Sequence, residues 1–296
     1  MCDSDMPSVD LIIPTYNALP ARLDRAVASG LKTSWIARVL VVDDGSSPPA
    51  QPSAASDGRV QLVRMPANAG PSAARNGGLD LSQAEFVVLL DDDDELLTGA
   101  KQAMDLATHL RAAAVVSARL ETTEQGRTRR RTVPAAWADR VLPAPSDVFT
   151  PIALFGASGM VIGPQALKAK LRFDEALRVG EDREFLRRVA DIGPIGVCAE
   201  TALRVTLHTN ADNLTSAANF SRRVRDFLAI LARHHNAQSD AHFNAAAHWL
   251  LNQLSKSGTD DESWDLLRAA FREHGWAVPL KPRLRRLLRR PRTARM

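Results

Sequence analysis

Short apolar runs that end in polar clusters mark the predicted strands in the first part of the chain. These runs cover residues 9–14, 39–42, 59–65 and 86–90, and the apolar residues between them have helical spacing through residue 31 and over 72–81. The strands are apolar throughout rather than alternating, as expected of strands that are buried on both faces. Strand and helix therefore alternate, which predicts a parallel sheet covered by helices on both sides.

The same patterns continue along the chain. We expect helices over 98–110 and 180–189, and strands over 113–118, 155–162 and 199–207. Residues 122–145 are polar and rich in arginine, which predicts a long surface loop. Its run Arg129–Arg131 predicts solvated charge, with contact to an anionic acceptor as the alternative. From about residue 217 the pattern becomes helical, over 220–233, 241–254 and 263–273.

These elements predict three regions. Residues 1–215 are expected to form an α/β domain with a doubly wound, mostly parallel sheet, and residues 216–280 a helical C-terminal extension. Residues 281–296 hold eight basic side chains and no acidic one, and form a basic tail.

Polar residues follow three of the predicted strands, at the edge where open α/β sheets bind ligands. Four consecutive aspartates, Asp91 to Asp94, can hold a hard divalent cation against phosphate oxygens. The alternative is a solvated acidic turn before a helix. Tyr16 and Asp44 suit a pyrimidine base, and Arg75 suits a diphosphate, although each has a structural explanation when taken alone. Together, these residues favour a nucleotide diphosphate as the ligand.

Composition and charge narrow the class of protein. The chain is 45% hydrophobic and 24% charged, as in soluble globular proteins, and no apolar run approaches the roughly 20 residues of a membrane span. Two cysteines predict no disulfide framework, and the acidic N-terminus does not resemble a signal peptide. We therefore expect a cytoplasmic protein. The net charge of +4 comes from the tail, so we expect no nucleic-acid partner.

The basic tail has an amphipathic pattern. Leu284, Leu287 and Leu288 recur at helical spacing among arginines. Such a helix suits peripheral contact with the anionic inner face of a membrane. The alternatives are a helix docked on the acidic body and a disordered tail.

The motifs at these strand ends resemble the family 2 glycosyltransferases, which have the glycosyltransferase A fold, over roughly residues 8–210. The resemblance rests on Val-Asp-Leu-Ile-Ile-Pro-Thr-Tyr-Asn at 9–17, Val-Val-Asp-Asp-Gly-Ser at 41–46, Asn-x-Gly-x-x-x-Ala-Arg-Asn-x-Gly-Leu at 68–79, Leu-Leu-Asp-Asp-Asp-Asp at 89–94 and Glu-Asp at 181–182. It implies a nucleotide-sugar donor that is bound by Pro14, Thr15, Tyr16, Asn17, Asp44 and Arg75. It also implies an Asp-x-Asp metal motif at Asp91 and Asp93, with Asp94 and His208 as further candidate ligands for Mn²⁺ or Mg²⁺. Asp92 departs from the serine that the family usually has, which leaves the choice among the carboxylates open.

The resemblance further implies a mechanism in which Asp182 is the general base and transfer inverts the anomeric carbon. A carboxylate opposite the leaving diphosphate can take the proton of an attacking sugar hydroxyl. Acids at the start of a helix are also common for electrostatic reasons alone. On the acceptor side, the resemblance points to Gly156, Ser158, Gly159 and Glu181. A lone histidine such as His208 is more often structural than a ligand.

We therefore expect a metal-dependent, inverting glycosyltransferase of polysaccharide biosynthesis that moves a sugar from a nucleotide diphosphate donor, with UDP-sugar as the expected donor. The expected acceptor is a hydroxyl of a saccharide or a lipid-linked saccharide. Two alternatives stay open: a sugar-nucleotide nucleotidyltransferase and a non-catalytic nucleotide-sugar-binding protein. A nucleotidyltransferase is expected to have a Gly-rich loop after its first strand, whereas this chain has Pro14-Thr15-Tyr16-Asn17 at that position.

Overall fold

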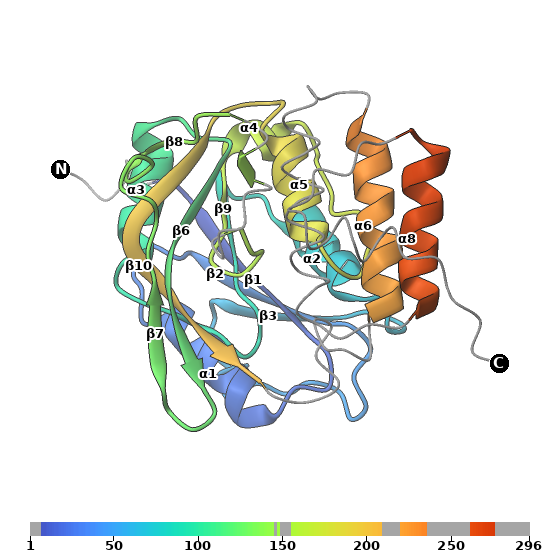
Figure 1. Cartoon of the computed structure of the whole chain (residues 1–296). Coiled ribbons are helices and arrows are strands. Elements are labelled where there is room, and N and C mark those ends of the chain that lie inside the picture. The colour runs from blue at the N-terminus through green and yellow to red at the C-terminus, as the bar shows by residue number, and fades with distance from the viewer. Residues whose placement is uncertain (1–6, 145–146, 149–154, 209–219, 236–260, 276–296) are drawn as a thin grey trace. The chain divides into compact units, whose positions relative to one another are not determined.

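The computed structural model describes residues 7–144, 147–148, 155–208, 220–235 and 261–275. The described strands form one ten-stranded sheet (Figure 1). The strands are β1 Val9–Thr15, β2 Arg38–Asp43, β3 Val60–Arg64, β4 Phe86–Leu89, β5 Glu95–Leu96, β6 Ala114–Thr123, β7 Thr128–Arg131, β8 Arg140–Val141, β9 Val161–Ile162 and β10 Ile195–Leu207. The helices are α1 Pro20–Leu31, α2 Pro71–Leu81, α3 Ala100–His109, α4 Pro164–Lys168, α5 Glu181–Val189, α6 Phe220–His235 and α8 Asp261–Glu273.

The sheet is mostly parallel, which confirms the predicted α/β class. Its order is β3-β2-β1-β4-β9-β6-β10-β5, with β7 paired to β6 and β8 to β10. Strands β3, β2, β1 and β4 are parallel neighbours, and β6 is parallel to β10. The short strand β9 is antiparallel to both β4 and β6, and it joins the two parallel groups.

Both faces of the central strands are buried, which explains why their sequences are apolar rather than alternating. Successive side chains of a strand point to opposite faces. Leu11 and Ile13 belong to one core cluster with side chains of α1 and α3. Ile12 faces the other side, where α2 packs so closely that a Cβ on Gly78 would stand 2.5 Å from its Cγ2. Glycine at position 78 thus sets the distance between α2 and the sheet.

The segment 122–145, which the sequence predicted to be a long loop, contains strands β7 and β8, so that prediction was wrong. β7 pairs antiparallel with the end of β6 and carries three consecutive arginines (Figure 1). Its side chains are mostly exposed, as in an edge strand protected by charge, and it therefore lacks an apolar pattern.

Other differences concern strand length and short elements. The strand predicted over 155–162 is limited to Val161–Ile162, and β10 begins at Ile195 rather than at residue 199. The two-residue strand β5 and the five-residue helix α4 were not predicted, because elements of this length have no periodicity to detect.

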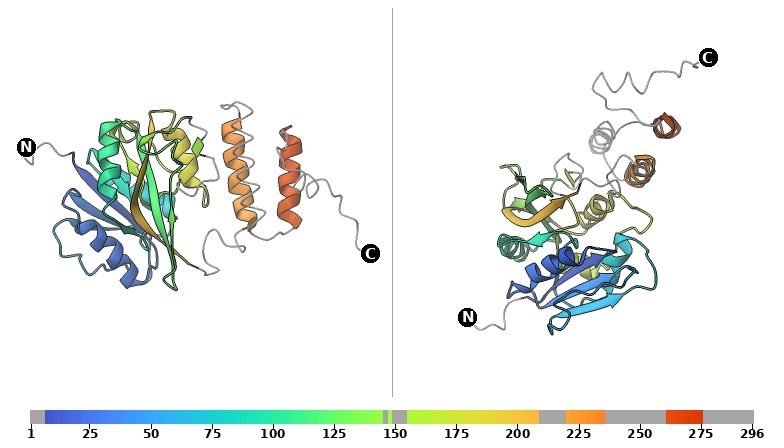
Figure 2. Two further views of the ribbon diagram at one scale, coloured as in Figure 1. Left: turned by 60° about the vertical axis from the view of Figure 1, so that its left-hand side comes forward. Right: turned by 90° about the horizontal axis from the view of Figure 1, so that it is seen from below.

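The chain divides into two compact units. The first comprises residues 1–148, 152–177 and 181–208, and the second 149–151, 178–180 and 209–296. In the second unit, α6 and α8 are neighbours (Figures 1 and 2), and Asp226 of α6 accepts hydrogen bonds of 3.0 and 3.1 Å from the amides of Arg178 and Val179. The predicted helices 220–233 and 263–273 correspond to α6 and α8.

Several predictions fall on other parts of the chain. The helix expected over 241–254, the domain boundary near residue 215 and the basic tail 281–296 lie outside the described residues. Within the described residues, no helix has the length and hydrophobicity needed to cross a membrane.

Candidate functional site

The carboxyl ends of three neighbouring parallel strands bring the predicted site residues to one edge of the sheet. β1 ends at Thr15, which is paired in register with Asp43 at the end of β2. β4 lies on the other side of β1 and leads into Asp91. Because these strands run in the same direction, the polar residues that follow them share this edge, as expected.

The acidic loop, Asp91 to Asp94, is a tight turn held by its neighbours. The amide of Asp94 donates to the carbonyl of Asp91 at 3.1 Å, and the amide of Asp91 donates to the hydroxyl of Ser158 at 3.1 Å. The Asp94 carboxylate is 3% exposed and accepts a hydrogen bond of 3.0 Å from the amide of Thr206 in β10. Ser158, predicted on the acceptor side, thus supports the acidic loop, and Asp94 ties that loop to β10.

Charge is concentrated in this loop. Burial raises the pKa of Asp92 to about 6, and the charges of Asp93 and Asp91 add to this rise. Burial and the charge of Asp91 also raise the pKa of Asp93, and the pKa of Asp94 is raised further for the same reasons. Removing these carboxylates from water therefore favours their neutral forms unless a cation joins them.

His208, at the end of β10, contacts the acidic loop. Its Nε2 lies 2.7 Å from Oδ2 of Asp93, and its Nδ1 lies 3.0 Å from Oε1 of Glu124. The predicted proximity of His208 to the metal motif is therefore present in the geometry. Its two carboxylate partners orient the ring, since a histidine with one nitrogen bonded has the other fixed in direction.

Arg75 joins the acidic loop to the start of α5. Its Nη2 donates to Oδ1 of Asp91 at 2.9 Å, and its Nη1 donates to Oε1 of Glu181 at 3.0 Å. The guanidinium is buried and lies over the ring of Phe173, 5.5 Å from its centroid. Burial alone would lower the pKa of Arg75, but the charges of Asp91 and Glu181 outweigh burial and raise it. Arg75 therefore stays charged.

Asp182 has a free carboxylate oxygen beside this cluster. Its Oδ1 accepts a hydrogen bond of 2.7 Å from the amide of Arg183, and among the described residues no hydrogen bond engages its Oδ2. Burial raises the pKa of Asp182, opposed by the positive charge of Arg183. The neighbouring Glu181 is buried, and burial together with Asp182 raises its pKa to about 7. One carboxylate thus keeps an oxygen without a hydrogen bond among the described residues, while its neighbour is held by Arg75.

The two glycines before β9, Gly156 and Gly159, differ in role. A Cβ on Gly156 would stand 4.0 Å from Oδ2 of Asp182 and 3.5 Å from Nη1 of Arg119. Gly159 has a φ of +79°, and a Cβ there would stand 2.7 Å from Leu203. Gly156 thus leaves space beside the predicted base, whereas Gly159 is required by the backbone and by packing.

The residues predicted at the nucleoside form a hydrogen-bonded frame. Asp44 is 2% exposed, and its two oxygens accept from the amides of Ala69 and Gly70 at 2.7 and 2.8 Å. Asn17 accepts a hydrogen bond of 2.8 Å from the amide of Ser47. Asp44 therefore fixes the loop before α2, a role that its predicted place beside a base did not include.

Tyr16 and Thr15 remain available to a ligand. Tyr16 is 50% exposed, and the buried hydroxyl of Thr15 has no hydrogen-bond partner among the described residues, although it faces Asp92 and lowers the pKa of that carboxylate. Thr15 and Asn17 also line a pocket of about 360 Å³, together with residues of α1 and the segment 46–51. Pro14 is buried within β1.

The aspartates of the acidic loop predict a metal requirement, which depends on whether their carboxylate oxygens suit a divalent cation. Carboxylate oxygens suit Mg²⁺ and Mn²⁺, and a cation would offset the mutual repulsion of the carboxylates in the acidic loop. Among the described residues, however, no group of three or more His, Cys, Asp or Glu side chains is arranged as a metal cage. Mg²⁺ is usually bound by one or two carboxylates plus substrate phosphates. The donors therefore fit a cation that is shared with a bound diphosphate.

Three contributors to the site were missed in the sequence. Glu124 orients His208, Thr206 binds the acidic loop through its amide and its hydroxyl, and Phe173 supports Arg75. Each acts through a partner far along the chain, and no local pattern marks such residues.

Comparisons with known proteins identify the family and support the fold. The model of the family "Glycosyl transferase family 2" matches residues 10–166. The succinoglycan biosynthesis protein ExoO of Rhizobium meliloti is 28% identical over 314 aligned positions, which cover 96% of this chain and 88% of that protein. The GalNAc(5)-diNAcBac-PP-undecaprenol beta-1,3-glucosyltransferase of Campylobacter jejuni is 36% identical over 101 positions, which cover 32% of each. The crystal structure of S. aureus TarS 1-349 in complex with UDP-GlcNAc has a TM-score of 0.67 at 19% identity, covering 92% of this chain and 82% of that one.

Proposed function

The chain belongs to glycosyl transferase family 2, and from this premise we propose that it is a metal-dependent, inverting glycosyltransferase with a UDP-sugar as donor. The acceptor is a hydroxyl of a saccharide or of a lipid-linked saccharide. Its α/β sheet has the glycosyltransferase A architecture that the TarS structures share.

One observation carries this proposal: Arg75 binds Asp91 and Glu181 at the same time. Asp91 belongs to the acidic loop, and Glu181 directly precedes the candidate base Asp182. Arg75 thus places the diphosphate side and the base side of one site within reach of a single guanidinium. Transfer requires this juxtaposition, because the nucleophile must approach the anomeric carbon opposite the departing diphosphate.

The donor assignment rests on the strand ends. Tyr16 offers an exposed ring against which a base can stack, and Thr15, which precedes it, lines the pocket of about 360 Å³. Arg75 offers a fixed cation to the diphosphate, provided that phosphate oxygens share the guanidinium with its carboxylate partners. TarS, which shares the fold, has been crystallised with UDP-GlcNAc, and this supports a uridine nucleotide.

Asp93 and Asp91 are the residues that would hold the proposed metal. When bound, such a cation offsets the negative charge that develops on the leaving diphosphate. His208 holds Asp93 in position through the hydrogen bond at 2.7 Å. Burial and, to a smaller extent, the charge of Asp91 raise the pKa values of Asp93 and Asp94, and a cation would oppose both effects.

Asp182 is the proposed base. Its Oδ1 is fixed by the amide of Arg183, which leaves Oδ2 to accept the proton of the acceptor hydroxyl. Burial raises its pKa toward the range in which a carboxylate accepts a proton most effectively. Glu181 is held by Arg75 and positions the start of α5.

Relatives support the class of acceptor. The Campylobacter enzyme is named for transfer to a polyprenyl diphosphate-linked saccharide, and ExoO for succinoglycan biosynthesis. We propose the same broad class here, a growing saccharide that is free or lipid-linked.

A UDP-release assay tests the proposal. The full-length protein is incubated with UDP-glucose, UDP-galactose or UDP-GlcNAc, with Mn²⁺, with Mg²⁺ or with EDTA. We expect slow hydrolysis of one donor that requires the cation and is lost in Asp182→Asn. Failure of every donor and of UDP itself to bind, measured by thermal shift, would overturn the proposal. Donor binding without hydrolysis or transfer would indicate a non-catalytic binding protein.

A further inference from the structure

A second arginine, Arg119, lies near the candidate base Asp182. Arg119 lies in β6, and its Nη1 is 3.5 Å from the point where a Cβ on Gly156 would stand. Oδ2 of Asp182 lies 4.0 Å from the same point. Because residue 156 is glycine, this point is unfilled by its own side chain, and a guanidinium and the proton acceptor both border it.

The guanidinium of Arg119 is only partly used by the protein. Its Nη2 donates to Oε1 of Glu121 at 2.8 Å, whereas its buried Nε has no hydrogen-bond partner among the described residues. A buried donor without a partner costs free energy, and native structures rarely leave one without a reason. Its Nη1, which borders the unfilled point beside Gly156, can donate to an acceptor group.

The charges around Arg119 leave a positive surplus. Glu121 is bound by two guanidinium groups, Arg119 at 2.8 Å and Arg131 at 2.7 Å. The two arginines lower the pKa of Glu121, so it is ionised but cannot neutralise both. Arg129, which is paired with Glu121 across the strands and exposed, adds charge on the same face of the β6–β7 hairpin.

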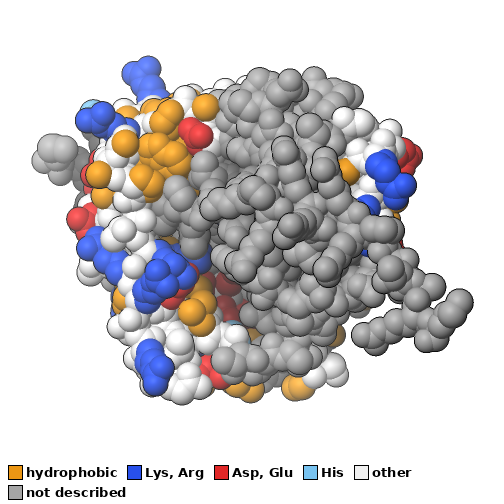
Figure 3. Space-filling view, viewed as in Figure 1, with side chains coloured by type: hydrophobic (Ala, Val, Ile, Leu, Met, Phe, Trp, Pro, Cys, Tyr) orange, Lys and Arg blue, Asp and Glu red, His pale blue; other side chains and the backbone are white. Residues whose placement is uncertain are grey.

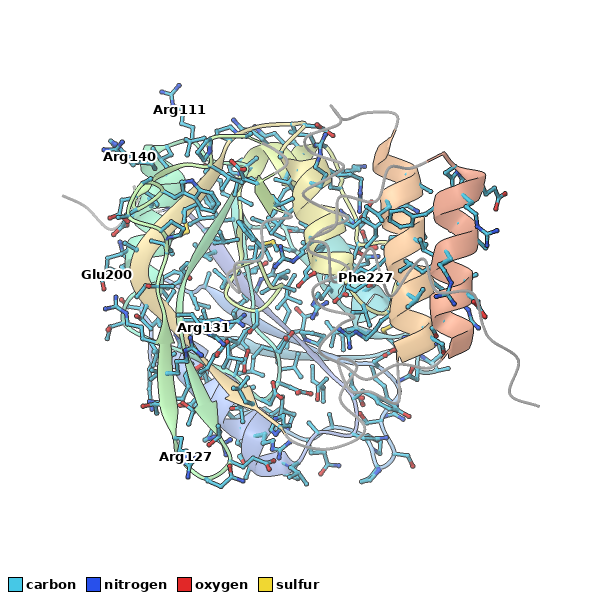
Figure 4. All side chains as sticks on the ribbon, viewed as in Figure 1. Arg111, Arg127, Arg131, Arg140, Glu200 and Phe227 are labelled. Atoms are coloured by element: carbon cyan, nitrogen blue, oxygen red, sulfur yellow. The ribbon has the colours of Figure 1, made fainter. Side chains whose placement is uncertain are left out.

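This charge is visible at the surface. Lys and Arg side chains gather over the β6–β7 region, close to carboxylate side chains (Figure 3). Figure 4 places Arg131 on β7 within this region and Arg127 near the turn of the hairpin. The sequence alone allows two interpretations of Arg129–Arg131, solvated charge and contact with an anionic acceptor. The pairing of β7 with β6 brings this run beside Arg119.

We propose that Arg119, with Arg129 and Arg131 beside it, forms a subsite for an oxyanion carried by the acceptor, a carboxylate or a phosphate, next to the hydroxyl that Asp182 deprotonates. This inference rests on the proposed glycosyl transfer and specifies the acceptor. A guanidinium suits such oxyanions, and charge-assisted hydrogen bonds are about twice as strong as neutral ones. Arg119 thus selects acidic acceptor sugars over neutral ones.

Sugar titrations on the full-length protein, saturated with UDP and MgCl₂, test the subsite. The probes are glucose, glucuronate and glucose 6-phosphate, and binding is followed by ligand-observed NMR. We expect at least one of the two acidic sugars to bind about tenfold more tightly than glucose. The acidic sugar that shows the preference identifies the oxyanion. Equal affinity for all three probes would overturn the proposal.

Variants connect the preference to Arg119. Arg119→Gln should remove it and Arg119→Lys should retain part of it, while Arg127→Gln at the exposed turn should leave it intact. If Arg119→Gln does not fold, Gly156→Ala supplies the second test, because its Cβ stands between Arg119 and Asp182 at ordinary contact distances of 3.5 and 4.0 Å. Persistence of the preference in either variant would overturn the subsite. If UDP causes no thermal shift in the wild-type protein, the result contradicts the proposed donor and not the subsite.

Discussion

Arg75 in α2 donates a hydrogen bond of 3.0 Å to Glu181 at the start of α5, across 106 positions of the sequence. The same guanidinium binds Asp91 at 2.9 Å. Two acidic segments that repel each other are thereby held together by one buried cation. This arrangement makes the site depend on Arg75 for both its geometry and its charge balance.

Replacing Arg75 tests this dependence. Arg75→Met leaves Glu181 buried without a cation, and breaking a buried pair in this way costs about 3–5 kcal/mol. Adding Glu181→Gln should recover part of the loss, because the uncompensated charge is then removed. The free energies of unfolding in urea of the wild type and of both variants measure the effect.

The matched control is Arg172→Met, which breaks an exposed pair with Asp80. It should cost less than about 1 kcal/mol. A similar loss in the Arg75 and Arg172 variants would contradict the special role of Arg75.

Asp182→Asn should lower the rate of sugar transfer at least about 100-fold, because the amide cannot accept the proton. UDP affinity should change little, since Asp182 faces the acceptor side through Oδ2. Initial rates and UDP titrations check the two expectations separately. Asp191→Asn, at an exposed position after α5, is the control and should keep wild-type activity. A variant Asp182→Asn with normal turnover would remove Asp182 from the mechanism.

Asp93→Ala should weaken the cation-dependent part of UDP binding about tenfold or more, because it removes a candidate ligand and frees His208. Thermal shifts with UDP are compared in Mn²⁺ and in EDTA. Asp105→Ala, on the exposed side of α3, should behave like the wild type. Identical Mn²⁺-dependent shifts in Asp93→Ala and the wild type would refute the role of Asp93.

The raised pKa of Glu181, about 7, predicts a pH dependence of stability. The folded protein keeps this proton up to about pH 7, whereas an unfolded glutamate loses it near pH 4.3. The folded state binds more protons in this window, so the contribution to stability is complete below the window and is lost as pH rises through it. Urea unfolding between pH 4.5 and 7.5 should show a smaller fall with pH in Glu181→Gln than in the wild type. Parallel curves would contradict the prediction.

Two adjacent glycines of α2 offer a test of packing. A Cβ on Gly78 would stand 2.5 Å from buried Ile12, whereas the nearest atom to a Cβ on Gly77 is 3.8 Å away. Gly78→Ala should therefore destabilise the protein by about 1–3 kcal/mol through overpacking. Gly77→Ala should be neutral or stabilising by up to about 1 kcal/mol, because alanine favours a helix. Thermal melting of both variants distinguishes the two, and equal melting temperatures would show that α2 can move away from the sheet.

The local patterns of the sequence were sufficient to identify the main elements of the sheet. Buried parallel strands need continuous apolar runs, and the helices between them need an apolar face, so both leave a periodic signal. The polar residues after β1, β2 and β4 could be placed at one edge because parallel strands end on the same side. The sequence also contained the motif order from which the family was recognised.

Only the tertiary structure decided which of these residues touch. The contact of Arg75 with Glu181, the position of His208 between Asp93 and Glu124, and the use of Asp44 to hold the loop before α2 all join segments far apart in the chain. The arginine-rich β7 was missed because its stability comes from pairing with β6 and from Glu121, rather than from an apolar pattern. Hydrophobic periodicity reports which face of an element is buried, but the partners of a polar side chain depend on how distant elements pack. The sequence therefore determined the elements and the chemistry at their ends, and the packing of β6, β10 and α5 against the parallel strands determined the site.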